Sequence, residues 1–280
     1  MPMIILSASV FAQGIYLRAG GGYGLPAAST KLGEQYLHAE VNDGVNYSNT
    51  YSNKIVSGSY GSGADFSISA GYEFNRNFLF DLNVQYLVGK KYETSDIYSY
   101  TGNSYSGTDS QISSTSSRGL YFNPALVFSV GFGKGAPYGR LGAIIASPKI
   151  ISDESSYYDL DGTYTSDIRW EYSNGLALGY QIGVGFNWKL TEKIDFYTEA
   201  GFISMTYYAK DGEMTKNIQD GIDVLDQLSV VQKQIVFKKT YDPNITYDPS
   251  QPLITGRQAS PMSSVSLQVG IRFLLWRKAE

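Results

Sequence analysis

The side chain of this sequence best suited to acid–base chemistry is its single histidine, His38, which lies between Glu34 and Glu40. Acyl transfer and hydrolysis need a nucleophile, a base and an orienting group held within reach of one another. Serine and acidic residues are abundant in the polar segments of the chain, but no spacing marks a triad with His38. We therefore expect His38 to be a solvated side chain, and we expect that the protein is not an enzyme.

The sequence gives no sign of a metal or cofactor site. It contains no cysteine, which excludes disulfides and thiolate metal sites. The segment 159–162 (Asp-Leu-Asp-Gly) resembles part of a calcium loop but lacks the full spacing of ligands, so we expect a turn there and no cofactor. The net charge of −4 gives no support for binding to nucleic acid, which requires a clustered basic face.

Nine further charged residues indicate a structural role and not a catalytic one. Each falls on the polar side of a segment in which apolar and polar residues alternate. Successive side chains of a strand point to opposite faces, so alternation gives one apolar wall and one polar wall. Charges enclosed inside a barrel, away from lipid, must be paired or hydrated. We predict an interior polar network made of Arg18, Asp65, Glu73, Asp81, Arg140, Lys189, Asp195, Glu199 and Arg272.

Eight segments carry this alternation, and the clearest is near the C-terminus, where Val265, Leu267, Val269, Ile271, Phe273 and Leu275 occupy every second position. Each segment is about as long as the roughly 9–11 residues that cross a bilayer as a tilted strand. No apolar run approaches the roughly 20 residues of a membrane helix. The predicted strands are 15–25, 64–74, 78–88, 120–132, 137–147, 175–190, 194–208 and 264–275.

The connections between these strands are of two kinds. Three are short, at 75–77, 133–136 and 191–193, and four are long, at 26–63, 89–119, 148–173 and 209–262. An even number of strands lets both termini and all short turns lie on the same side. We predict an all-β fold, an eight-stranded antiparallel up-and-down transmembrane β-barrel with long extracellular loops and short periplasmic turns. A soluble sandwich or a lipocalin-like barrel is the alternative, but its outer face would carry Lys and Glu where these strands carry Phe, Leu and Val.

The long connections are rich in Ser, Tyr, Asn, Gly and Asp, as in the stretch 98–105. Such a mixture suits molecular recognition, and it suits plain solvated loops equally well. The last long connection also contains Ile218, Ile222, Leu225 and Leu228, a spacing that predicts a short helix packed on the barrel rim within 213–231. The segment 232–241 that follows is predicted to be extended.

The first residues predict export. Residues 3–11 are apolar, and small residues precede a possible cleavage point after Ala12. This pattern is typical of the end of a signal peptide, whereas the alternative is a buried first strand. We therefore predict a residual signal peptide over residues 1–12 and a single barrel domain over residues 13–280.

Several short motifs carry a family resemblance. The stretches 20–24 (Gly-Gly-Gly-Tyr-Gly), 71–74 (Gly-Tyr-Glu-Phe), 123–125 (Asn-Pro-Ala) and 269–273 (Val-Gly-Ile-Arg-Phe) resemble strands of small Gram-negative outer-membrane β-barrels, namely OmpA-like transmembrane domains and opacity-type proteins. The resemblance covers the strands, roughly half of the chain, and not the loops. Cleavage before Gln13 is similar to that of Bacteroidetes exports.

The resemblance implies an outer-membrane protein with a structural or surface-interaction role. Its expected partners are outer-membrane lipid and lipopolysaccharide, the barrel assembly machinery during biogenesis, and a protein or surface ligand on the loops. Eight strands enclose a space that side chains fill, so we expect the interior to be largely plugged. The glycines of segment 175–190 could receive Tyr16, Tyr121 or Tyr197, or leave a narrow porin-like channel as the alternative. An outer-membrane lipid-modifying enzyme is the third hypothesis.

Overall fold

The computed structural model describes residues 14–28, 30–42, 44–75, 77–131, 134–159, 162–241 and 248–277. Over these residues the chain forms 17 strands of one sheet and very little helix, which confirms the all-β prediction. No helix in this part of the chain has the length and apolarity needed to span a membrane. The predicted signal peptide, residue 76 of the first short turn, residue 132 of the predicted strand 120–132, residue 133 of the second short turn, and residues 160 and 161 of the predicted turn at 159–162 lie outside the described residues.

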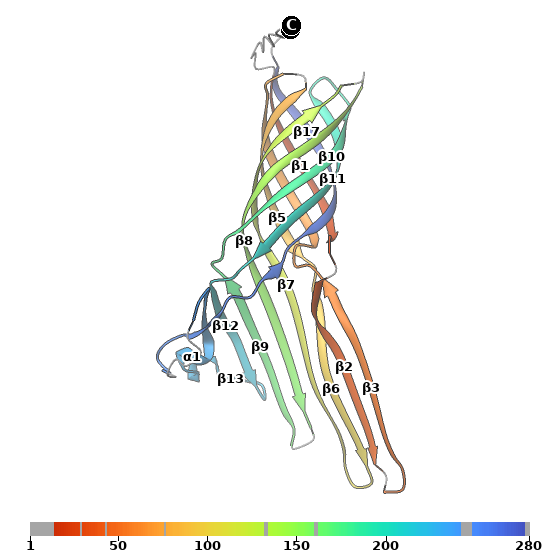
Figure 1. Ribbon diagram of the computed structural model, residues 1–280, viewed down its shortest axis with the longest axis vertical. Helices are drawn as coiled ribbons and strands as arrows, with labels where there is room; N and C mark the ends of the chain where they lie inside the picture. Colours follow the sequence, from red (N-terminus) through yellow and green to blue (C-terminus); the bar gives the residue numbers. More distant parts are fainter. Residues whose placement is uncertain are drawn as a thin grey trace, which may run out of the picture.

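Eight strands form a closed ring (Figure 1), and each contains most of one predicted segment. Each pairs antiparallel with the next along the chain, and the first pairs with the last. The ring strands are β1 (Gly14–Pro26), β4 (Gly63–Glu73), β5 (Phe78–Gly89), β7 (Ser106–Ser129), β8 (Gly135–Tyr158), β10 (Ala177–Lys189), β11 (Ile194–Tyr207) and β17 (Ser264–Arg277).

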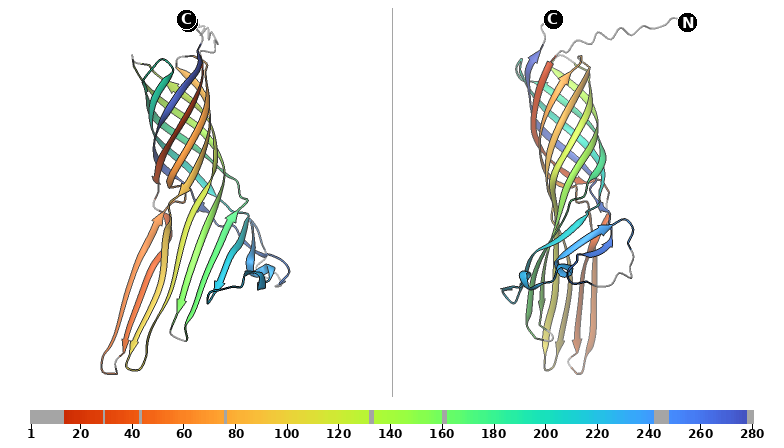
Figure 2. Two further views of the ribbon diagram at one scale, coloured as in Figure 1. Left: turned by 180° about the vertical axis from the view of Figure 1, so that it is seen from behind. Right: turned by 90° about the vertical axis from the view of Figure 1, so that its left-hand side faces the viewer.

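The expectation of eight strands in all was wrong, because segments predicted to be long loops are themselves strands. Strands such as β3 and β6 are rich in Ser, Thr, Tyr and Asn on both sides, so apolar alternation does not reveal them. The further strands are β2 (Thr30–Asn42), β3 (Tyr47–Gly58), β6 (Tyr92–Gly102), β9 (Tyr164–Ser173), β12 (Asp211–Gln219), β13 (Ile222–Asp223), β14 (Gln234–Lys238), β15 (Leu253–Gly256) and β16 (Ser260–Pro261). Apart from β16, which pairs with β11, they extend the sheet beyond the ring as a region that we call the arm. Figure 2 shows the arm leaving the ring at the end opposite the last residues of β17.

Strands β7 and β8 connect the two regions, because each is 24 residues long and runs from the ring into the arm (Figure 1). Their pairing keeps one register from Ser110 opposite Tyr157 to Ser129 opposite Tyr138. At about 3.3 Å per residue, such a strand spans roughly 80 Å. The arm is therefore joined to the ring by continuous sheet and not by a flexible linker. Segments 120–132 and 137–147 were predicted too short at their arm ends.

Burial in the ring is the reverse of that in a soluble barrel. In β17, the apolar Leu267 is 62% exposed and its neighbour Gln268 is 6% exposed. In β4, Phe66 and Ile68 are exposed whereas Asp65 and Ser67 are buried. The apolar residues of the alternating pattern therefore form the outer face of the ring, and the polar residues form its core.

The helix predicted within 213–231 was wrong. Residues Asp211–Gln219 form β12, which pairs with β9 on one side and with β14 on the other. Only a 3₁₀ turn (Leu225–Gln227) and one turn of helix α1 (Val230–Lys233) are present. A short helix gains little by itself, whereas an extended segment beside β9 completes the hydrogen bonds of that strand. The extended conformation predicted for 232–241 is confirmed over Gln234–Lys238, which form β14, whereas Gln232 and Lys233 belong to α1.

Candidate functional site

Four charged side chains meet inside the ring and form a closed cycle of ion pairs. Arg18 lies 3.4 Å from Asp81 and 3.2 Å from Glu199, and Arg140 lies 2.5 Å from Asp81 and 3.2 Å from Glu199. Their side chains are 7% exposed or less. They come from β1, β5, β8 and β11, which are alternate strands of the ring. Two positive and two negative charges balance, so this quartet ties four sides of the ring together without net charge.

Two tyrosines complete the surroundings of the quartet. The hydroxyl of Tyr138 accepts a hydrogen bond from Arg18 at 3.0 Å and donates one to Glu199 at 2.8 Å. The guanidinium of Arg18 also lies 3.9 Å from the centre of the Tyr197 ring, a cation–π contact. Buried charges persist only when their hydrogen-bonding groups find partners, and these tyrosines supply some of them. Sequence reasoning missed Tyr138, although its inward position in β8 could have indicated it.

The other predicted interior charges lie on either side of the quartet. Towards the short turns, Arg272 pairs with Glu73, lies 3.7 Å from Asp195, and covers the ring of Tyr16. Towards the arm, Asp65 accepts a hydrogen bond from the Gln268 amide at 2.8 Å. All of these residues are buried except Asp195, which is half-buried.

Lys189 was predicted to join this network, and the structure contradicts that prediction. It is the last residue of β10, next to the turn at 190–193, and it is exposed. Its position in the alternation is inward, but at the end of a strand the barrel wall no longer encloses the side chain. Alternation predicts the face of a residue and not its distance from the rim.

The interior is filled by tyrosines that stand over glycines. Tyr16, Tyr121 and Tyr197 are each at most 2% exposed, in line with the filled alternative. A Cβ atom at Gly71 would collide with the Tyr16 ring, and one at Gly20 would collide with the Tyr197 hydroxyl. These two glycines lie on β4 and β1 and not on β10, where we expected them. The β10 glycines 183 and 185 instead face Glu199 and Tyr138.

An apolar cluster fills the arm end of the ring, and sequence reasoning missed it. Of its members, only Tyr121 was expected inside the ring. They are Leu87, Tyr121, Ile144, Ala146, Ile150, Ala177, Ile203, Met205, Tyr207 and Met262. Apolar packing at the arm end of the interior therefore adjoins the charge-paired layer of the quartet.

His38 lies far from these residues in sequence and structure, in arm strand β2. Its Nε2 atom is 3.0 Å from the Asn49 side-chain oxygen, and its ring stacks on Tyr51 at 4.4 Å. Tyr98 lies 4.8 Å away and donates its hydroxyl hydrogen to Glu40. These contacts fix the imidazole between aromatic rings across β2, β3 and β6. Among the described residues, none of these contacts joins a serine hydroxyl or a carboxylate directly to the imidazole.

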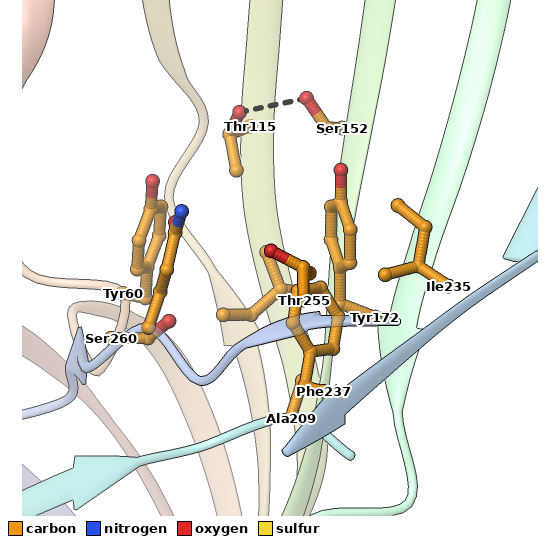
Figure 3. A pocket seen from close by; sticks show the side chains of 11 residues that line it. Tyr60, Thr115, Ser152, Tyr172, Ala209, Ile235, Phe237, Thr255 and Ser260 are labelled. Atoms are coloured by element: carbon orange, nitrogen blue, oxygen red, sulfur yellow. Dashed lines mark hydrogen bonds between the residues drawn. The ribbon is translucent and has the colours of Figure 1, made fainter. Parts of the chain in front are cut away.

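A cavity of about 350 Å³ lies where the arm joins the ring. Figure 3 shows Tyr60 on one side, Tyr172 and Phe237 close together on the other, and the hydrogen-bonded pair Thr115 and Ser152 beyond. The two hydroxyls of this pair are 3.1 Å apart. Burial raises the pKa of both Tyr60 and Tyr172, so both phenols stay protonated at neutral pH.

The chain was compared with known proteins. A family model described as outer membrane protein beta-barrel domain matches residues 2–226. The match includes the ring strands from β1 to β11 and most of the arm, and it ends before β17. No curated protein is significantly similar to the chain.

Proposed function

Since the chain belongs to the outer membrane protein beta-barrel domain family, we propose that its eight-strand ring crosses the outer membrane as a closed anchor, and that the arm stands on the extracellular side to contact other molecules. The observation that carries this proposal is the reversed burial of the ring, with apolar side chains outside and paired charges inside. Such a surface is favourable in hydrocarbon and unfavourable in water.

Aromatic side chains support this placement of the ring. Near the short turns, Phe78 contacts both Phe74 and Phe128, and Trp188 contacts Phe186. Towards the arm, Tyr180 on the same strand as Trp188 contacts Phe202. Eight residues of tilted strand separate Tyr180 from Trp188, or roughly 20 Å along the membrane normal, and the apolar band of such barrels is about 25 Å tall. The two aromatic groups therefore match the two interfaces of a bilayer.

The arm has the composition of a surface that meets water and partners. In β3 almost every residue is exposed, and its side chains are mainly Tyr, Ser and Asn. Such residues provide rigid contact area together with adaptable hydrogen bonds. The partners that we propose are outer-membrane lipid and lipopolysaccharide around the ring, the barrel assembly machinery during insertion, and a protein or surface ligand on the arm.

Surface labelling of intact cells tests the orientation. An epitope inserted after Val45, which is 90% exposed at the tip of the β2–β3 hairpin, should bind antibody without permeabilisation. The same epitope in the turn at 191–193 should bind only after permeabilisation. Labelling of the turn epitope in intact cells would contradict the proposal.

Planar-bilayer recordings test the closed interior. The wild-type protein should give no reproducible open steps, because the quartet and the apolar cluster fill the ring. Regular steps would show that the channel alternative is correct. We also propose that the protein is not an enzyme; lipid A modification that is present in wild type and lost in His38→Ala would show otherwise.

A further inference from the structure

The cavity between ring and arm has the features of a ligand site. We propose that it binds a neutral sugar ring, such as one hexose unit of a glycan at the cell surface. The access of an extracellular glycan to this cavity rests on the proposed orientation of the arm. The chemistry of the site is independent of that orientation.

The size of the cavity sets the first limit on the ligand. Its volume of about 350 Å³ is at the lower end of the range for small-molecule sites, roughly 300–1,000 Å³. A single ring with short substituents suits this volume better than a long chain. The floor is formed by β7, β8 and β9, and the covering wall by β14 and the residues around Thr255 (Figure 3).

The lining residues indicate the chemical class. Tyr60, Tyr172 and Phe237 offer ring faces with partial negative charge, against which the C–H bonds of a sugar face can pack. Hydroxyl and amide groups lie among them to bond the sugar hydroxyls: Thr115, Ser152, Thr255, Gln258 and Ser260. Among the described lining residues there is no Lys, Arg, His, Asp or Glu. A charged ligand would therefore lose hydration without gaining a partner of opposite charge among these lining residues.

The lining side chains are held in place before any ligand arrives. The Tyr172 ring stacks on Trp170 with centres 6.2 Å apart and an angle of 8°, and the Phe237 ring centre lies 6.0 Å from that of Tyr172. Tyr172 sits opposite Ile150 in the ladder between β8 and β9. Side chains that are already ordered lose little entropy on binding, so a weak set of contacts can suffice.

Calorimetric titration of the full-length protein tests the proposal. The protein must be kept in a zwitterionic detergent, because alkyl glycosides carry sugar head groups that would compete. The probes are methyl β-glucoside and maltose, compared with glucuronate and glucosamine as charged sugars and with cyclohexanol as an apolar ring. We expect saturable millimolar binding of the neutral sugars, and binding at least about tenfold weaker for the other probes.

Four variants locate the binding. Ala209→Trp should fill the cavity and abolish binding, and Tyr172→Ala should weaken it by about tenfold. Thr255→Val keeps the shape and should weaken it by roughly threefold. Tyr51→Ala removes an exposed aromatic residue of β3 and should leave binding unchanged.

Three results would overturn the site: no binding of either neutral sugar, binding of cyclohexanol as tight as that of the glucoside, or binding unaffected in Ala209→Trp. Periplasmic labelling of the arm combined with sugar binding in detergent would instead refute only the proposed orientation.

Discussion

The ring and the arm share the two long strands β7 and β8, yet their surfaces differ. In the ring half of β7, the outward residues are Leu120, Phe122, Leu126 and Phe128, and all are exposed. In the arm half, the same strand carries mainly Ser and Thr. The change comes near Gly119, which pairs with Pro148 of β8. Backbone and register continue unchanged across this level, so the side chains alone distinguish a part suited to lipid from a part suited to water.

Ion pairs differ between the two regions in the same way. The side chains of the quartet are nearly inaccessible, whereas in the arm Arg169 and Asp153, 2.6 Å apart, are 47% and 35% exposed. Water screens the arm pair, so its contribution to stability is small. Removal of one partner from a buried pair leaves the other charge without compensation.

The largest effect is expected when the quartet is broken. Asp81→Ala leaves Arg18 and Arg140 buried beside one remaining carboxylate, and it should lower the free energy of unfolding by about 3–5 kcal/mol. Asp153→Ala, the matched change in the arm, should cost about 0–1 kcal/mol. Urea unfolding in lipid vesicles, followed by tryptophan fluorescence, measures both. Equal effects would mean that the interior is hydrated.

The second-largest loss of stability is expected from an arginine introduced on the outer face of the ring. Leu126→Arg, in the ring half of β7, should destabilise the inserted protein by roughly 2–4 kcal/mol if it lies near the bilayer centre. Ile112→Arg, at an exposed position in the arm half, should change stability by about 0.5 kcal/mol or less. The same unfolding assay separates them, and a tolerated Leu126→Arg would place the ring outside the membrane.

A smaller effect tests the packing of the interior. Gly71→Ala pushes a methyl group into the Tyr16 ring and should cost about 1–3 kcal/mol. Gly131→Ala meets open space at the end of the ring and should be close to neutral. If both substitutions were neutral, as judged by thermal stability in micelles, the interior would be loosely packed and the channel alternative would gain support.

Alternation in the sequence was enough to predict the ring strands and most of the interior charges. Strand geometry has a period of two residues, so Arg18, Asp81, Arg140 and Glu199 had to share the inner face. Their mutual contacts could not be predicted, because these depend on the stagger of the strands around the ring. Apolar inward residues, such as Ile144 and Met205, are not distinguished by the alternation, because a membrane barrel is expected to be polar inside.

The arm was not predicted, for a physical reason. Strands such as β3 expose both faces, so their sequence lacks the apolar period that signals a strand. In the last connection, Ile218 was assigned to a helix by its spacing, yet it pairs with Asp167 in the β9–β12 ladder. Hydrogen bonds to β9 determine that this segment is extended, and β9 is distant from it in the sequence.

Spin labels placed one at a time along β7 test most directly the claim that one strand passes from membrane to water. Labels at Leu120, Phe122, Leu126 and Phe128 in vesicles should be accessible to oxygen and protected from a water-soluble nickel reagent. Labels at Thr108, Ser110 and Ile112 should show the reverse, with the change between residues 112 and 120. Accessibility to the nickel reagent along the whole strand would contradict the membrane placement of the ring.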